Sequence, residues 1–280
     1  MCVSLSLSLS FKQHPIVSLG IGSFGPIDLN PASPQFGHIT STPKLAWQDC
    51  DVVGHFKSLN IPINFNTDVN GAALAEVVWG DHHLKSNFPV RNLVYVTVGT
   101  GIGAGVVVDG QAVSGLLHPE AGHFRVPRHP DDSYKGNCPF HSDCLEGLAN
   151  AKACADRCQK APSELHTVGD DHPAWDIEAF YLANLCMTLA TIVSPHVIVL
   201  GGGVLKRTVL YNKTREQLVK LNNGYLRSDR LMPSEVDRYV VSSRFEKEGS
   251  GTSAGCVGVL ELARRAYEEV SEKKKTKALL

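Results

Sequence analysis

The fold class is decided by the stretch Leu93-Val94-Tyr95-Val96-Thr97-Val98-Gly99-Thr100-Gly101-Ile102-Gly103-Ala104-Gly105-Val106-Val107-Val108. Its first part is a β-branched run that is apolar at nearly every position, which is typical of a strand buried on both faces of a sheet. Alternating glycines follow, and a second strand-like run comes after them. This pattern predicts a tight hairpin whose bare backbone amides can approach phosphate oxygens. The alternative is a glycine-rich hairpin that only packs against its neighbours.

Two further runs of this kind, residues 16–20 (IVSLG) and 197–201 (VIVLG), also end in glycine. Residues 177–192 and 255–270 place apolar side chains at three- and four-residue steps, which predicts helices. Alternation of strand, glycine loop and helix predicts an α/β protein with two lobes and a cleft between them. We expect the first lobe at residues 1–97, the second at 98–265, and a solvated C-terminal tail at 266–280.

The composition narrows the classes of function. The chain has 280 residues and a formal net charge of −1, and 43% of its residues are hydrophobic. A near-neutral chain is poorly suited to bind nucleic acid or an anionic membrane by bulk charge. No apolar run approaches the roughly 20 residues that cross a bilayer. The opening MCVSLSLSLSF lacks the basic region of a secretory signal, so we expect a cytoplasmic protein.

Residues 20–25 (GIGSFG) match the dinucleotide fingerprint G-x-G-x-x-G. That fingerprint requires a helix directly after the glycines. Pro26 and Pro31 follow instead, so a nicotinamide-dependent oxidoreductase is disfavoured. A third glycine loop, Gly201-Gly202-Gly203, ends another predicted strand and could accommodate a flat group such as adenine. Glycine loops at the ends of separate strands favour a phosphorylated ligand.

A metal site is predicted from four residues. Cys138, His141 and Cys144 form the compact pattern C-x-x-H-x-x-C, and His123 lies upstream as a fourth ligand. Two imidazoles and two thiolates suit a closed, structural zinc site that stabilises a loop with little apolar content. Cys154 and Cys158 are interpreted instead as small packing residues on a helix.

Three carboxylates are candidates for the chemistry. Asp68 follows a predicted strand at the start of a helix of small residues, where it is either a helix cap or a general base aimed at a hydroxyl. Glu120 and Glu146 bracket the predicted metal loop at 120–146. They could bind neighbouring sugar hydroxyls, or they could be solvated surface charges.

Several motifs together resemble one protein family. LGIGSFGPID, TPKLAW, TDVNGAALAE, VTVGTGIGAG, HPEAGH, RHPDD, CPFHSDCLEGLA and VIVLGGG occur in this order, over about residues 16–265. They are similar to the ROK-family fructokinases of bacterial type, and the CPFHSDC form of the zinc loop points to the fructokinase subgroup. The resemblance implies an actin-like/hexokinase-like (ribonuclease H-like) fold with the active site in the cleft between its lobes.

The resemblance also implies an activity and roles for individual residues. The enzyme would transfer the γ-phosphate of ATP, with Mg²⁺, to the 6-hydroxyl of fructose. Asp68 matches the catalytic base, and Zn²⁺ would be held by the four residues named above. The sugar contacts would be Gly25, Glu120, His123 and Glu146. The nucleotide contacts would be Thr100, Gly101, Gly103, Gly201, Gly202 and Gly203. Family members are commonly homodimers.

One departure from the family pattern leaves a second hypothesis. The family opens with a hairpin and a phosphate loop of the type GGTK, and the first 18 residues here contain neither. We expect such a loss to reduce activity, because a single lost donor to a transferring group typically costs about 10²–10³ in rate. The alternative is therefore a truncated, non-catalytic protein that binds sugar or zinc. A ROK repressor is excluded, since these residues offer no helix-turn-helix.

Overall fold

The structure is a computed structural model that describes residues 15–82, 89–245 and 252–278. Strands and helices alternate along it, which confirms the predicted α/β class. The strands are β1 (Leu19–Ser23), β2 (His38–Ile39), β3 (Cys50–Asp51), β4 (Ile63–Thr67), β5 (Leu93–Val98), β6 (Ile102–Val108), β7 (Gln111–Ala112), β8 (Val197–Gly201) and β9 (Val240–Ser242). The α-helices are α1 (Asp68–Trp79), α2 (Leu145–Ala149), α3 (Ala151–Arg157), α4 (Ala174–Ile192), α5 (Val209–Asn222) and α6 (Ala254–Ala278).

The main sheet has five strands in the order β7-β6-β5-β8-β9. Strand β5 is antiparallel to β6 and parallel to β8, and Leu93 pairs with Val197. Alternate residues of β5 face opposite cores: Val94, Val96 and Val98 pack with α4, while Leu93 and Tyr95 pack with residues of α1. Both faces are therefore covered by helices, and this burial explains the near-continuous apolar runs.

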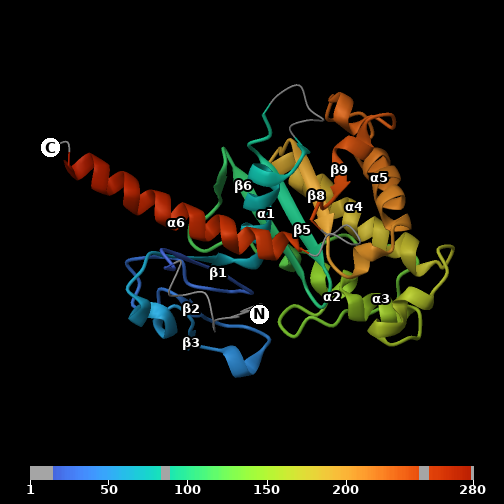
Figure 1. Cartoon of the computed structure of the whole chain (residues 1–280). Helices are drawn as coiled ribbons and strands as arrows, with labels where there is room; N and C mark the ends of the chain where they lie inside the picture. Colours follow the sequence, from blue (N-terminus) through green and yellow to red (C-terminus); the bar gives the residue numbers. More distant parts are fainter. Residues whose placement is uncertain (1–14, 83–88, 246–251, 279–280) are drawn as a thin grey trace.

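A second, smaller body contains strand β1 paired in parallel with β4. Ile21, Ile27, Ile39 and Phe65 form its core, and each is at most 7% exposed. Helix α6 packs against β1 and β4 as well as α1 (Figure 1). The sequence-based division assigned α6 up to residue 265 to the second lobe, but the contacts of α6 lie mainly with α1, β1 and β4 of the first. The boundary at 97/98 stays a prediction.

The glycines of residues 20–25, which match the dinucleotide fingerprint, allow close packing of the backbone. Gly20 lies in β1 directly under α6, and a Cβ there would collide with the Val259 carbonyl. Gly71 of α1 and Gly258 of α6 face each other in the same way. After β1 the chain enters turns instead of a helix, as predicted. Glycine here brings backbones together and does not hold a pyrophosphate.

Two predicted boundaries were wrong. The run 16–20 was expected to be a buried strand, but β1 begins at Leu19, and Ile16 and Val17 are 43% and 52% exposed. The C-terminal helix was expected over 255–270, but α6 continues to Ala278. Residues 272–276 are exposed, as the solvated tail predicted, and i,i+4 pairs such as Glu269–Lys273 extend the helix there. Within the described ranges, every helix is too short or too polar to cross a bilayer.

Candidate active site

Asp68 is the first residue of α1 and directly follows β4. Thr67, not Asp68, caps the helix, because the Thr67 hydroxyl accepts a hydrogen bond from the Asn70 amide at 3.0 Å. The capping interpretation of Asp68 is therefore wrong. Its Oδ1 accepts from the Val69 amide at 2.8 Å, which fixes the orientation of the carboxylate. Burial by the surrounding protein raises the pKa of Asp68, although the side chain still reaches solvent.

Glu146 lies in α2, immediately after the predicted metal loop. Its Oε2 accepts a hydrogen bond from the Ile102 amide at 2.8 Å. This bond joins α2 to the glycine hairpin between β5 and β6. A Cβ on Gly101 would lie 2.6 Å from the same oxygen, so Gly101 allows the carboxylate to approach the backbone.

Glu120 lies three residues before His123, in the segment between β7 and α2. Burial raises its pKa to about 7, and repulsion from Glu146 and Asp68 adds to the increase. Repulsion between like charges weakens with distance, so the carboxylates that act on Glu120 lie near it. The amide of His123, whose Nε2 lies 3.9 Å from Glu146 Oε1, also donates to the Glu120 carbonyl at 3.0 Å. The three predicted carboxylates therefore come together at one site, although they lie on three different segments. The loop after β1 reaches the same place, since a Cβ on Gly25 would lie 2.7 Å from Glu120 Oε1.

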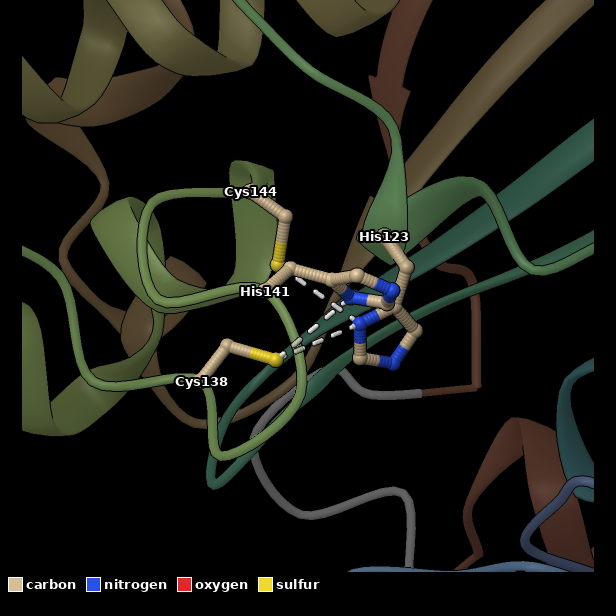
Figure 2. Close-up of side chains that lie close together, drawn as sticks. All are labelled: His123, Cys138, His141 and Cys144. Atoms are coloured by element: carbon tan, nitrogen blue, oxygen red, sulfur yellow. Dashed lines mark hydrogen bonds between the residues drawn. The ribbon is translucent and has the colours of Figure 1, made fainter.

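The four predicted metal ligands also come together (Figure 2). One donor atom from each of His123, Cys138, His141 and Cys144 lies within 4.8 Å of the others. His123 Nδ1 is 3.7 Å from Cys138 Sγ and 3.6 Å from Cys144 Sγ. In a tetrahedral zinc site, bonds of about 2.0–2.3 Å place neighbouring ligand atoms roughly 3.5 Å apart. The donor set and its spacing fit zinc.

His123 connects this cluster to the carboxylates. Its Nδ1 faces the two thiols, while its Nε2 lies 3.9 Å from Glu146 Oε1. A metal-ligating histidine commonly directs its other ring nitrogen to a carboxylate. One imidazole can thus hold a metal on one side and face the carboxylate site on the other. Burial raises the pKa of the Cys144 thiol to about 11, and the neighbouring Cys138 and Glu146 add to the increase.

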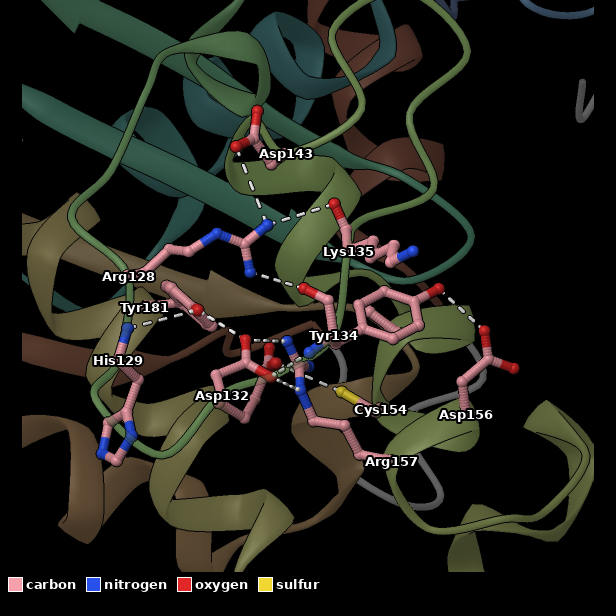
Figure 3. Close-up of polar contacts among 12 residues, drawn as sticks. Arg128, His129, Asp132, Tyr134, Lys135, Asp143, Cys154, Asp156, Arg157 and Tyr181 are labelled. Atoms are coloured by element: carbon pink, nitrogen blue, oxygen red, sulfur yellow. Dashed lines mark hydrogen bonds and ion pairs between the residues drawn. The ribbon is translucent and has the colours of Figure 1, made fainter.

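A buried ion pair anchors the segment that leads into the metal loop (Figure 3). Asp132 and Arg157 form two hydrogen bonds, at 3.0 and 2.8 Å, and their side chains are only 2% and 7% exposed. Tyr181 donates a third bond to Asp132 at 2.6 Å. Burial opposes the charge on Asp132, but the bonds from Arg157 and Tyr181 outweigh it and lower the pKa of Asp132. This anchor does not depend on a metal.

A cavity of about 780 Å³ opens beside the carboxyl ends of β5 and β8. Thr100 and Gly203 line it, as expected for a nucleotide site at the ends of parallel strands. The other predicted nucleotide residues are not among its lining. Gly103 packs against Val69 of α1, which agrees with the packing interpretation of the hairpin. Gly101 faces Glu146, Gly201 is buried in β8, and Gly202 packs against the backbone of Val98.

Several residues at these sites could not be recognised from the sequence. The far wall of the cavity contains Trp175, Lys206 and Arg207, and Arg207 donates to the Leu165 and His166 carbonyls. His118 lies against Glu120, with Nδ1 3.5 Å from Glu120 Oε1. The only available signal for His118 was its place in the HPEAGH motif.

The chain is similar to known proteins over most of its length. Residues 5–266 match the ROK family. The chain is 41% identical to a fructokinase of Pediococcus pentosaceus over 259 residues, which cover 92% of this chain and 84% of that protein. It is also 41% identical to a fructokinase of Zymomonas mobilis over 251 residues, covering 89% of this chain and 78% of that protein.

Among solved structures, the chain resembles a ROK hexokinase from Thermus thermophilus. The identity is 26% and the TM-score is 0.66, with 91% of this chain and 80% of that chain covered. These likenesses confirm the predicted actin-like, hexokinase-like α/β fold class.

Proposed function

The chain belongs to the ROK family, and from this premise we propose that it is a fructokinase, which transfers the γ-phosphate of ATP to the 6-hydroxyl of fructose. The observation that carries the proposal is the meeting of Asp68, Glu120 and Glu146 at one site beside a histidine-cysteine cluster. Fructokinases that are 41% identical over most of the chain favour this activity over a non-catalytic sugar- or zinc-binding protein.

The residues of the site have different roles in this proposed reaction. Asp68 accepts the proton of the attacking hydroxyl, and its pKa, raised by burial, suits a base that must take up a proton. Glu120, Glu146 and the Nε2 side of His123 bind neighbouring sugar hydroxyls, and Gly25 leaves room for them. ATP occupies the cavity lined by Thr100 and Gly203, and Mg²⁺ on its phosphates would neutralise charge on the transferred group.

Zinc has a structural role in this proposal. His123, Cys138, His141 and Cys144 would hold it, and a closed site with four protein ligands supplies rigidity instead of a reactive water. It fixes His123 and the start of α2, which carries Glu146. The first test is a coupled assay of the 280-residue chain with ATP, Mg²⁺ and fructose. Turnover of ATP that depends on fructose supports the proposal, and sugar binding without turnover overturns it.

Glycine 203 offers a specific test of the nucleotide site. It is exposed with φ −61°, and a Cβ built on it would meet nothing within 4 Å. The substitution Gly203→Val should therefore leave the fold intact but fill part of the cavity. We expect the KM for ATP to rise about tenfold and the KM for fructose to stay unchanged.

The control for this variant is Gly115→Val, at another exposed glycine with open space around it. It should leave both KM values unchanged. A rise in the fructose KM of Gly203→Val, with the ATP KM unaltered, would mean that the cavity does not hold the nucleotide.

Fructose binding should depend on pH through Glu120. The carboxylate form accepts hydrogen bonds from the sugar, and its pKa is about 7 because of burial and repulsion from Glu146 and Asp68. Calorimetric affinity should thus fall about tenfold per pH unit below pH 7 and level off above it. Glu120→Gln should bind more weakly and show no such slope. Zinc content, measured over the same range, separates this effect from metal loss, and a slope retained in Glu120→Gln would contradict the assignment.

A further inference from the structure

We propose that His118 is a positioning residue, which holds Glu120 toward the sugar as a neutral imidazole protonated on Nδ1 and fastens it to the loop after β1. The proposal rests on the fructokinase assignment for its kinetic consequences. The state of the ring can be tested without it.

A backbone amide determines the tautomer of His118. His118 Nε2 lies 3.0 Å from the amide nitrogen of Ile27, and an amide can only donate. Nε2 must therefore be the unprotonated acceptor, and the proton of the neutral ring is on Nδ1. A charged ring would place two N–H groups against each other. The His118 side chain is 2% exposed, so solvent cannot relieve that conflict, and burial lowers the pKa of His118 in the same direction.

The proton on Nδ1 of His118 is directed toward Glu120 and the Pro119 carbonyl. Nδ1 lies 3.5 Å from Glu120 Oε1 and 3.4 Å from the Pro119 carbonyl oxygen, so it faces two acceptors. The Pro119 carbonyl is the closer acceptor and takes the hydrogen bond, while Glu120 Oε1 is near enough for the positive end of the Nδ1–H dipole to stabilise its negative charge. A Cβ on Gly25 would lie 2.7 Å from both Glu120 Oε1 and His118 Cε1. The three groups are packed together with no room for a side chain at position 25.

The Nε2 side of His118 is attached to the loop after β1. Ile27 is completely buried and bridges Ile39, and its neighbour Asp28 donates its amide proton to the His38 carbonyl. The acceptor nitrogen of His118 is thus bonded to the body built on β1 and β4. Helix α1, which carries Asp68, follows β4 directly. His118 therefore connects Glu120 to the body that also carries Asp68, the proposed base. His123, in contrast, belongs to the metal loop.

The charges around Glu120 show why a donor matters there. The carboxyl groups of Glu146 in α2 and Asp68 in α1 act on it by charge repulsion. The loop after β1 contributes Gly25, which has no charge, and the titratable groups on the segment of Glu120 itself are His118 and His123, whose ring is directed to the metal cluster and Glu146. A donor to the ionised form lowers the pKa of a carboxyl group. Removing the Nδ1 proton should therefore leave the Glu120 carboxylate less well held and weaken its binding of the sugar.

Two amide substitutions separate the functions of the ring nitrogens. In His118→Gln, the amide oxygen can replace Nε2 as the acceptor for Ile27, but no donor remains at the Nδ1 position. In His118→Asn, the shorter amide can replace Nδ1 as a donor but cannot reach Ile27. His55→Gln, at an exposed histidine on the first lobe, serves as the control.

For His118→Gln we expect near-native thermal stability and a KM for fructose raised about 10- to 100-fold, with kcat changed much less. For His118→Asn we expect lower thermal stability, because the Ile27 amide loses its acceptor, with a smaller rise in the KM for fructose. The KM for ATP should change in neither variant. An unaltered fructose KM in His118→Gln would reduce His118 to a structural residue and overturn the proposal.

Nitrogen-15 NMR of the histidine rings provides an independent test. At neutral pH His118 should show an unprotonated Nε2 and a protonated Nδ1, and His118→Gln identifies its signals by their loss. The opposite tautomer or a charged ring would overturn the proposal and leave the kinase assignment standing. The expected tautomer in a chain that never phosphorylates fructose would instead refute the proposed function, and with it the kinetic role of His118.

Discussion

The substitution Asp68→Asn should reduce kcat for fructose phosphorylation by about 10²- to 10⁴-fold, the contribution expected of a general base. The asparagine amide oxygen can still accept the hydrogen bond from Val69, and Thr67 still caps α1, so the helix should be unaffected. Only the ability to accept a proton is lost. Fructose affinity should be retained or increased, because removing one negative charge relieves Glu120.

The measurement is a coupled assay over a range of fructose and ATP concentrations, together with calorimetric titration of fructose. Asp49→Asn is a suitable control: Asp49 is exposed and has a positive φ of 57°, a conformation that asparagine also tolerates. It should have native kinetics. If Asp68→Asn retained kcat within tenfold of the native enzyme, a different group would have to accept the proton.

The elements that could be predicted from sequence are those whose signal is local. The apolar runs of β5 and β8 indicate strands covered on both faces, and the hydrophobic cores on either side of the sheet confirm this. The spacing of Cys138, His141 and Cys144 brings three ligands into one turn, because the chain can reverse within so few residues only by a tight loop. Ser142, at a φ of 58°, provides that reversal.

Features that depend on distant segments could not be derived in this way. His118 accepts a hydrogen bond from the amide of Ile27, which is 91 residues away, and Asp132 pairs with Arg157 across 25 residues. Gly20 and Gly22 match a nucleotide fingerprint, but here the lack of a side chain lets the backbone pack closely under α6 and beside Asp68. A glycine in a sequence indicates close approach without saying what approaches, and of the loops at 99–105 and 201–203 only Gly99, Thr100 and Gly203 line the cavity.

Replacing a metal ligand should have the second large effect. In Cys144→Ser, zinc content should fall from about one per chain to near zero, since a serine hydroxyl is a poor ligand beside one thiolate and two imidazoles. Binding of a structural metal is coupled to folding of its loop. Cys144 is fully buried, directly before α2, so the disturbance should reach Glu146. We expect Tm to fall by about 5 °C or more and the KM for fructose to rise at least tenfold.

Elemental analysis, thermal unfolding and steady-state kinetics on the same preparations check these expectations, and Cys256→Ser is the matched control. Cys256 is exposed at the start of α6 and lies outside the metal cluster, so the variant should keep its zinc, its Tm and its KM. The nucleotide cavity and the metal loop are lined by different residues, so the KM for ATP should change less than that for fructose in Cys144→Ser. The Asp132–Arg157 pair should keep the segment before the loop folded. The structural change should therefore be confined to His123, Glu146 and the loop between them. Zinc content that is already near zero in the native protein, with full activity, would show that the cluster holds its shape through the thiol and imidazole contacts alone.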